Sequence, residues 1–518
     1  MTHFDRYKSP FRIVLAAALS LLVALFVIST RHWPLVGDAS LVRYVVFLMQ
    51  HGFAPYRDIV DINMPGSYLV DWLVLHILGS GNTAWRVFDV ALLAATGVSM
   101  VAMSRKIDWL SGFIAAAVFA VLHGADGIAQ TGQRDLTVAV LLFASLAFFF
   151  RWMRTQQLWP IALAALLAGF AVTIKPTAAP FAIALVVLMF ALPEKRPPAI
   201  WKHLLAGTIA FAAPLIFLLI FLLHEHALRA FLLIVRGLLP FHAGLSHRSL
   251  AWLLMHSVAP LQIFLLPWLF LLIRAKSWRQ WQNVALLAAI ACGLISYIAQ
   301  GKGYPYHRYT LIGFLLLAMA MEFLAAFRRD RLDSTIGALS LLGLVFVTAP
   351  IATLKASRYD WRNQEFITML ESDLNQQGGS QLSGQVQCLD TTAGCINTLY
   401  RMKLIQSTGF LYDCYFFAPG QTPATEQLRD KFLDELTKAK PRIIIVSNQF
   451  CLNGARNFNK VENWPQFNAY FSQHYTLLVE RRPPHLVKWW GRAEQPSEYR
   501  IYTRRAGEDP VQPQSPAH

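Results

Sequence analysis

Aspartates recur in a polar segment near the N-terminus, and their chemistry suits the activation of a hydroxyl group. Asp38 comes soon after the first apolar run, and Asp58 and Asp61 follow in the same segment. An ionised carboxylate beside a hydroxyl group can act as a general base. We therefore predict Asp38 as the catalytic base, with Asp58 or Asp61 in a second acidic role. The structural alternatives are a helix cap at Asp38 and a cap or turn at Asp61.

Cationic and aromatic residues occupy several other polar segments. Lys175 interrupts an apolar stretch, where an ionisable residue is costly and usually functional, with snorkelling to the membrane surface as the alternative. Lys and Arg can stabilise the charge on a departing phosphate oxygen, and aromatic rings can stack on sugars. We predict donor-phosphate or substrate-binding roles for Lys175, Lys302, His307, Arg308, Tyr304, Arg134, Arg86 and Tyr56. The alternative for His307 and Arg308 is the binding of anionic lipid headgroups.

Metal and nucleotide chemistry find little support in the sequence. The histidines His224, His226, His242 and His247 match no compact metal-ligand spacing, so we interpret them as surface or headgroup residues. A divalent metal held by Asp38 and a second acid remains an alternative cofactor. The sequence contains no glycine-rich phosphate loop such as the Walker A pattern, which fits a transfer that needs no nucleotide.

Long apolar runs separate these polar segments. The chain has 518 residues, of which 55% are hydrophobic and 15% charged. A bilayer core about 30 Å thick selects helices of roughly 20 apolar residues, because every backbone polar group must be bonded internally. We predict a polytopic α-helical membrane protein with about eleven transmembrane helices, over residues 13–30, 84–103, 110–122, 136–150, 159–174, 178–192, 204–223, 250–273, 283–299, 310–326 and 335–354.

Basic residues determine the predicted orientation. They gather in the short loops between spans, so the net charge of +16 suits membrane lipids better than nucleic acid. The clusters are Arg6/Lys8/Arg12, Arg105/Lys106, Arg151/Arg154, Lys195/Arg196/Lys202, Arg274/Lys276/Arg279 and Arg328/Arg329/Arg331. If all are cytoplasmic, the N-terminus is inside and the chain after Lys355 is outside. The run Ser67–Leu78 is too short to cross, so we predict an interfacial or re-entrant helix within a first external loop, residues 31–82.

The C-terminal part has the pattern of an extramembrane α/β domain, residues 355–504, followed by a disordered tail, residues 505–518. Strands are predicted at 386–390, 442–447, 475–481 and 499–503, and helices at 425–438 and 461–474. The cysteines of this part suggest one or two disulfides in an oxidising compartment, with three complete pairings open. They are Cys388, Cys395, Cys414 and Cys451.

The sequence resembles the GT-C superfamily of polyprenyl-phosphate-sugar-dependent glycosyltransferases, particularly the protein O-mannosyltransferase and ArnT-like aminoarabinose transferase branch. The resemblance rests on Gly37-Asp38, the loop from Pro55 to Tyr68, Arg86, Arg134-Asp135, Lys175-Pro176 and Lys302–Tyr306. It implies that Asp38 is the catalytic carboxylate and that Lys302, His307 and Arg308 belong to the donor-phosphate site. The chain lacks the paired Asp-Glu of the mannosyltransferases, which leaves the second acidic role to Asp58 or Asp61.

The expected function is therefore transfer of a sugar from a polyprenyl-phosphate donor to an acceptor hydroxyl outside the cytoplasm. The acceptor is a glycolipid, a polysaccharide or a protein, and the expected location is a bacterial inner membrane with a periplasmic or extracellular C-terminal domain. The alternative is a transporter or flippase of a lipid-linked substrate. Transporters often show internal repeats and midplane charges, whereas this sequence shows no convincing repeat and places its charges at one predicted face.

Overall fold

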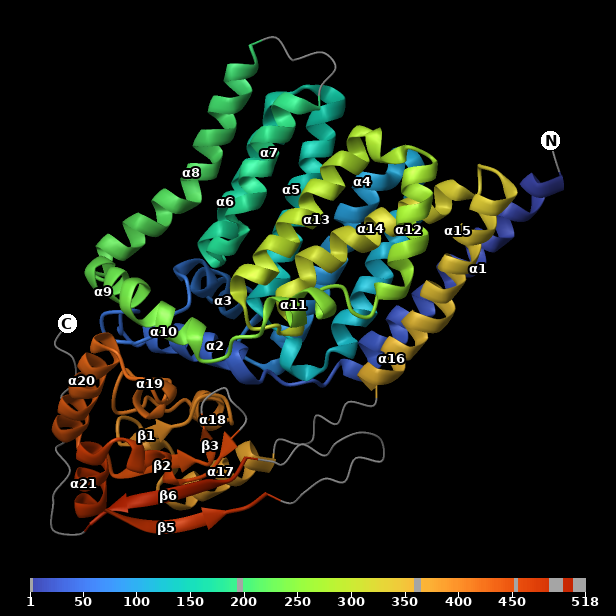
Figure 1. The fold of residues 1–518 in the computed structure, drawn as a ribbon. Helices are drawn as coiled ribbons and strands as arrows, with labels where there is room; N and C mark the ends of the chain where they lie inside the picture. The colour runs from blue at the N-terminus through green and yellow to red at the C-terminus, as the bar shows by residue number, and fades with distance from the viewer. Residues whose placement is uncertain (1–2, 193–198, 358–364, 451–454, 484–496, 506–518) are drawn as a thin grey trace. The chain divides into compact units, whose positions relative to one another are not determined.

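The computed structural model describes residues 3–192, 199–357, 365–450, 455–483 and 497–505. The chain forms two compact units (Figure 1). Unit 1 contains Met1–Leu35, Met64–Leu218 and Arg248–Tyr359, and unit 2 contains Val36–Asn63, Leu219–His247 and Asp360–His518. The predicted tail lies outside the described residues except for Arg505.

Unit 1 is built from helices. They are α1 (His3–Thr30), α3 (Pro65–Leu78), α4 (Asn82–Ala125), η1 (Ile128–Gln130), α5 (Arg134–Thr155), α6 (Leu158–Ile174), η2 (Pro176–Ala178), α7 (Ala179–Ala191), α8 (Ile200–His224), which continues into unit 2, α11 (Leu250–His256), α12 (Gln262–Arg274), η4 (Ser277–Arg279), α13 (Trp281–Gln300), η5 (Pro305–Arg308), α14 (Tyr309–Ala326), α15 (Arg331–Gly343), η6 (Leu344–Thr348) and α16 (Ala349–Ser357).

The helices of unit 1 confirm a polytopic membrane architecture. Among the described residues, seven helical segments are long and apolar enough to cross a membrane, and three shorter apolar helices accompany them. The 44-residue α4 contains two predicted runs, and the non-helical backbone of Asp108 divides it between them. The predicted run 250–273 is not one helix: α11 and α12 are separate, because Pro260 lacks an N–H and disfavours helix before it. The count of about eleven spans stays a prediction.

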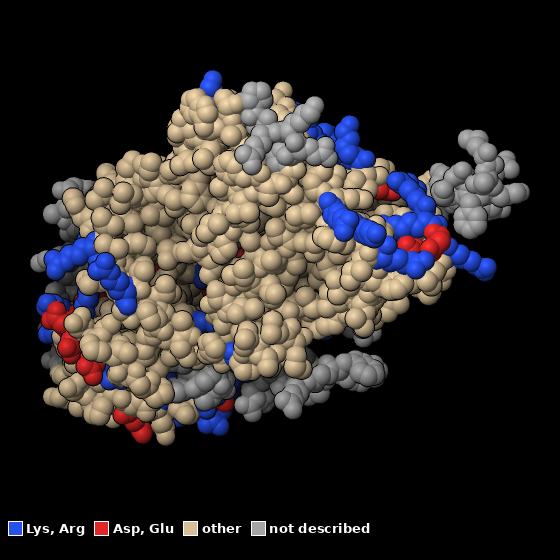
Figure 2. Space-filling model, turned by 45° about the horizontal axis from the view of Figure 1, so that its top comes forward, with Lys and Arg blue, Asp and Glu red and all other residues tan. Residues whose placement is uncertain are grey.

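The core of unit 1 lies around α14. Figure 1 shows α4, α5, α13 and α14 packed side by side, and α14 is almost wholly buried. By contrast, almost no residue of α8 is buried, and large apolar side chains such as Ile209, Ile216 and Phe217 are exposed on its surface. Figure 2 shows a broad face on which few charged side chains are visible. Exposed apolar surface of this extent is stable when lipid covers it.

Basic residues gather at one end of unit 1. Arg12 and Arg328 both pair with Asp108, where Arg328 lies 3.8 Å from the carboxylate. Arg154 donates to the carbonyl of Met103 at 2.9 Å, and Arg274 pairs with Asp330 at 2.7 Å. Four of the six predicted basic clusters therefore have a residue at this end. A fifth cluster, Arg105/Lys106, lies next to Met103, which is at the same end. This grouping supports the predicted common side of the membrane.

Unit 2 combines short helices with a small mixed sheet. Its elements are α2 (Gly37–Met49), α9 (Leu228–Leu233), the π-helical η3 (Ile234–Leu238), α10 (Leu239–Gly244), α17 (Glu365–Gln376), η7 (Gly379–Leu382), β1 (Val386–Leu389), α18 (Cys395–Met402), α19 (Cys414–Phe417), α20 (Pro423–Ala439), β2 (Ile443–Ser447), β3 (Gln449–Phe450), β4 (Ala455–Arg456), η8 (Asn459–Asn463), α21 (Pro465–His474), β5 (Tyr475–Arg481) and β6 (Tyr499–Arg504).

The main sheet has the order β1-β2-β6-β5, and the four predicted strands are all present. β1 and β2 are parallel, while β6 is antiparallel to both β2 and β5. The residues of β2 are buried throughout, as a continuous Ile-Ile-Ile-Val run in a central strand requires. The C-terminal α/β class is therefore confirmed.

Segments distant in the sequence join within unit 2. The N–H of Val60 donates to the carbonyl of Gly409 at 2.8 Å. The Tyr44 hydroxyl donates to the carbonyl of Leu404 at 3.0 Å and accepts from the N–H of Gln406 at 2.9 Å. Residues from the predicted first external loop are thus hydrogen-bonded to the C-terminal part of the chain.

A disulfide joins β1 to the start of α18, between Cys388 and Cys395. Of the pairings that the sequence left open, the structure therefore contains the one that joins Cys388 to Cys395. Cys451 lies outside the described residues, so the second predicted pairing stays a prediction.

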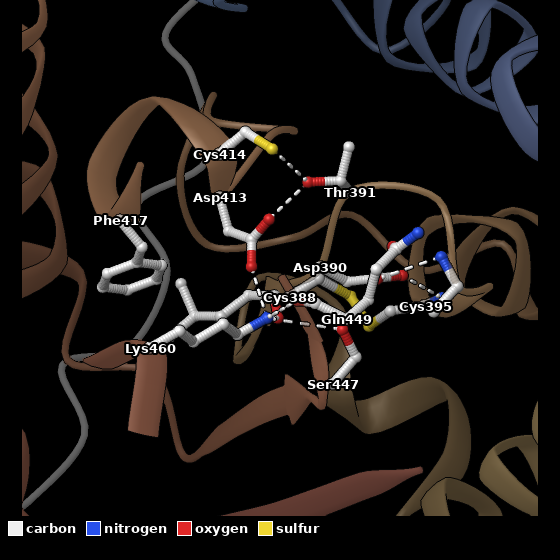
Figure 3. A network of polar contacts seen from close by, with 12 residues as sticks. Cys388, Asp390, Thr391, Cys395, Asp413, Cys414, Phe417, Ser447, Gln449 and Lys460 are labelled. Atoms are coloured by element: carbon white, nitrogen blue, oxygen red, sulfur yellow. Dashed lines mark hydrogen bonds and ion pairs between the residues drawn. A yellow bond between two sulfur atoms is a disulfide. The ribbon is translucent and has the colours of Figure 1, made fainter. Parts of the chain in front are cut away.

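A buried polar network stabilises the carboxyl ends of β1 and β2 (Figure 3). The Lys460 ammonium donates to Asp413 at 2.5 Å and to the carbonyl of Gln449 at 2.8 Å, and both charged side chains are almost fully buried. Asp390 accepts from the N–H of Cys395 at 2.9 Å and from the Ser447 hydroxyl at 2.8 Å. The buried charges are therefore paired and hydrogen-bonded, as burial requires.

Replacing Lys460 by methionine should lower the free energy of unfolding by about 3–5 kcal/mol, because Asp413 then remains buried without its cation. The measurement is the thermal unfolding midpoint of the purified full-length chain. Lys438→Met is the matched control, since Lys438 pairs with Asp434 at 2.7 Å on the surface and exposed pairs contribute little. Equal midpoints for the two variants would contradict the role given to Lys460.

Candidate functional site

The first candidate site begins at Lys175, in the break between α6 and η2. Pro176 cannot continue α6, so the helix ends and Lys175 takes an extended backbone. Its ammonium lies 2.5 Å from a carboxylate oxygen of Asp135, in the first turn of α5. It also lies 5.9 Å from the centre of the Tyr306 ring. Lys175 is thus oriented by a carboxylate and an aromatic ring from two other segments.

The loop between α13 and α14 brings further cations to the same place. Arg308 pairs with Asp126 at 3.2 Å, and His307 is buried within the electrostatic field of Lys175, Lys302 and Arg134. The Tyr304 ring centre lies 5.3 Å from that of His307. We name Arg134, Lys175, Lys302 and Arg308 the cationic cluster, and the buried His307 lies beside it.

The cationic cluster lies at the opposite end of unit 1 from the basic residues described above. α5 begins at Arg134 and ends beside Arg154, and α14 begins after Arg308 and ends before Arg328. Both helices start at the cationic cluster and end at the basic residues of the opposite end. The two groups of residues are therefore separated by the length of a membrane-crossing helix.

Arg86 has different neighbours from the cationic cluster. It pairs with Asp89 and donates to the Thr30 hydroxyl at 2.6 Å. His123 lies 3.3 Å from Asp89 through one ring nitrogen and 2.8 Å from the Tyr309 hydroxyl through the other. This buried chain ties α1, α4 and α14 together. These contacts are structural, and the predicted substrate role of Arg86 stays a prediction.

The second candidate site contains the carboxylates of unit 2. Asp58 accepts from the N–H of Ala54 at 2.8 Å and pairs with Arg57 at 2.8 Å. Burial alone would raise the pKa of Asp58, but the hydrogen bonds from Arg57 and Ala54 outweigh it, so the pKa lies below its usual value. Both oxygens of Asp58 are thus engaged in fixing a turn.

Asp61 has a comparable local role. It is fully buried and accepts from the N–H of Ile62 at 2.7 Å and from both the backbone and the side chain of Asn63. The buried Tyr56 hydroxyl donates to the carbonyl of Asn63 at 2.5 Å. The turn role that the sequence left open for Asp61 is therefore present, and Tyr56 supports the same turn.

Asp38 lies in the first turn of α2, where a negative charge suits the positive end of the helix dipole. The N-cap position belongs to Val36, so the alternative of an N-cap at Asp38 is wrong. Asp38 is half-buried, whereas Asp61 is fully enclosed. Asp38 is therefore the more accessible of these two carboxylates, and its catalytic role stays a prediction.

Tyr415 and His242 accompany these carboxylates, although the sequence singled out neither for this role. The Tyr415 hydroxyl lies 3.2 Å from Nδ1 of His242, in a hydrogen bond between α19 and α10. Burial, with the charges of Asp61 and Asp38, holds the pKa of Tyr415 well above its usual value. Tyr415 is thus a neutral hydroxyl at physiological pH. No local pattern could have found it, because its partners come from distant segments.

A metal at either site was tested against the donor set. The described residues contain no group of three or more His, Cys, Asp or Glu side chains placed to hold a metal ion. Asp58 and Asp61, two of the three carboxylates that the sequence offered, are engaged with Arg57, Asn63 and backbone amides. We therefore derive no step through a metal.

The comparison with known proteins rests on solved structures, because no protein-family model and no curated protein matches the sequence. An ArnT from Cupriavidus metallidurans, bound to undecaprenyl phosphate, is similar over 95% of this chain and 98% of its own, with a TM-score of 0.56 and 12% identity. The Archaeoglobus fulgidus oligosaccharyltransferase AglB, in complex with an inhibitory peptide and a dolichol-phosphate, is similar over 93% and 80%, with a TM-score of 0.53 and 12% identity. The chain therefore has a fold like that of these GT-C glycosyltransferases. At this identity, the GT-C likeness shows the fold alone, and the chemistry must be argued from the two sites.

Proposed function

We propose that this chain is a membrane glycosyltransferase that moves a sugar from a polyprenyl-phosphate donor to an acceptor hydroxyl on the periplasmic or extracellular face. The observation that carries the proposal is the convergence of the cationic cluster from separate segments at one end of a membrane-embedded unit. A lipid phosphate is an anion held at that depth by its chain, and Lys and Arg are the groups that stabilise it when the sugar departs.

The proposed chemistry gives the cationic cluster and Asp38 separate roles. In unit 1, the cationic cluster binds the donor phosphate and stabilises the charge that develops on its leaving oxygen. In unit 2, Asp38 removes the proton from the acceptor hydroxyl as that oxygen attacks the anomeric carbon. The bond between the sugar and the phosphate breaks, and the lipid phosphate leaves with the electron pair. The lipid phosphates bound to the ArnT and AglB structures support a donor of this class.

The proposed location is a bacterial inner membrane with a cytoplasmic N-terminus. The basic residues at one end of unit 1 support a cytoplasmic side, and the cationic cluster then lies at the outer side. Labelling of Lys302 from each side of sealed vesicles tests this assignment. Modification only from the cytoplasmic side would contradict it.

The decisive assay uses purified protein with a polyprenyl-phosphate sugar and candidate glycolipid, polysaccharide and protein acceptors. Transfer of label to an acceptor supports the enzyme. Movement of the labelled lipid across sealed vesicles without any transfer would instead support the transporter.

Replacing Lys175 by alanine should weaken the binding of undecaprenyl phosphate by about 10- to 100-fold, the value of a hydrogen bond to a charged group. The measurement is the Kd of the purified chain for that lipid. Lys202→Ala is the matched control, since Lys202 lies 5.7 Å from the Trp201 ring centre much as Lys175 lies near Tyr306. If Lys175→Ala unfolds because Asp135 is left unpaired, the double variant with Asp135→Asn replaces it. Unchanged affinity would contradict the phosphate role.

A further inference from the structure

The segment Arg248–His256, which contains α11, touches the loop of the cationic cluster at three points. The N–H of Arg248 donates to the carbonyl of Gly301 at 2.8 Å. The Trp252 ring lies against Gly303. The Arg308 guanidinium donates to the carbonyl of His256 at 3.1 Å. One short segment therefore holds the beginning, the middle and the end of the loop that carries Lys302 and Arg308.

The middle contact leaves no room for a side chain at Gly303. Gly303 has a φ of +71°, and a Cβ atom there would lie 2.2 Å from the Trp252 ring. Glycine is thus required both by the backbone and by the approach of the ring. The Trp252 ring is itself fixed, because the Arg248 guanidinium lies 5.2 Å from its centre and the His256 ring stacks on it at 4.0 Å.

The outer side of the same segment is apolar. Leu250, Leu254 and Met255 are 56%, 47% and 69% exposed. The loop that the segment contacts joins α13 to α14, and both belong to candidate membrane spans. α11 therefore lies at the level where spans end. Apolar side chains exposed at that level insert into the boundary between lipid headgroups and acyl chains.

We propose that Arg248–His256 is a lipid-anchored clamp that positions the Lys302–Arg308 loop. The partner of its apolar side is the bilayer itself. Trp252 is a positioning residue: it holds the backbone between Lys302 and Tyr304 in place. The cationic side chains, and not Trp252, bind the anion. That the loop binds a lipid phosphate rests on the proposed function, whereas the clamp stands on its own contacts.

The test compares Trp252→Ala with the wild-type chain in phospholipid nanodiscs. Amide hydrogen exchange of residues 301–308 should become at least about tenfold faster, because these amides lose their cover. Binding of undecaprenyl phosphate should weaken by about tenfold, since small misplacements of binding groups are costly. Trp252→Phe keeps an aromatic ring and should fall between the two, and it replaces Trp252→Ala if that variant does not fold.

Trp278→Ala is the matched control. Trp278 also lies beside an arginine, with the Arg279 guanidinium 5.0 Å from its ring centre, but it belongs to the basic end of unit 1. This variant should leave exchange at 301–308 unchanged. Equal exchange in Trp252→Ala and Trp278→Ala would overturn the clamp. If exchange is faster in Trp252→Ala but the wild-type chain binds no undecaprenyl phosphate, the clamp is supported and the proposed lipid-phosphate donor is contradicted.

The lipid anchor is tested by replacing Leu254 and Met255 together with glutamine. Exchange at 301–308 should rise several-fold in nanodiscs, because the clamp then loses its hold on the bilayer. Exchange equal to that of the wild-type chain would overturn the anchoring role and leave a clamp held by protein contacts alone.

Discussion

Replacing Asp38 by asparagine should lower kcat by about 10²- to 10⁴-fold while the chain stays folded, because the amide cannot take a proton from the acceptor hydroxyl. The effect should appear in kcat and in kcat/KM alike, since the lost interaction forms only as the proton moves. The measurement is transfer from a polyprenyl-phosphate sugar under saturating donor. Donor affinity should stay unchanged, because the cationic cluster is intact.

Two further substitutions decide whether Asp38 is the base. Asp434→Asn changes an exposed aspartate of α20 in the same unit and should leave kcat unchanged. Asp61→Asn should lower the unfolding midpoint, because its new amide group would face the N–H groups that now donate to the carboxylate. If Asp38→Asn keeps its turnover while a folded Asp61→Asn loses it, the base is Asp61.

The membrane helices and the main strands could be predicted from the sequence because each carries a local signal. Span length and the clusters of basic residues indicated the helices of unit 1, and apolar runs such as Ile443–Val446 indicated the strands. Long-range pairing has no such signal. The bridge between Val60 and Phe410 joins the predicted first external loop to the C-terminal part, and no pattern in either segment indicates the other.

The structure gives each predicted site residue its neighbours, and the predicted catalytic and binding roles stay predictions. Lys175, Lys302, His307 and Arg308 come together as the sequence indicated. Asp58 and Asp61, in contrast, hold turns, and Arg86 joins a buried network with Asp89. A carboxylate has the same sequence signature whether it binds a backbone amide or a substrate, so only the contacts separate these roles.

Gly409 shows how closely the two distant segments of unit 2 approach. A Cβ atom at this position would lie 1.7 Å from the carbonyl oxygen of Asp58, and the same residue accepts the hydrogen bond from Val60. Both neighbours are backbone atoms in a segment whose turns are fixed by Asp58 and Asp61. The segment cannot yield to a side chain there without losing those turns.

Replacing Gly409 by alanine should therefore lower the free energy of unfolding by about 3 kcal/mol or more, because the methyl group forces apart two hydrogen-bonded segments. Faster hydrogen exchange at residues 54–63, with a lower unfolding midpoint of the purified chain, is the expected measurement. Gly244→Ala is the matched control, since a Cβ atom there meets nothing within 4 Å in the same unit. If both variants unfold alike, the segments do not rely on this approach. If only Gly409→Ala is destabilised and it loses sugar transfer along with protection at 54–63, the C-terminal part of the chain holds in place the segment that carries the candidate carboxylates.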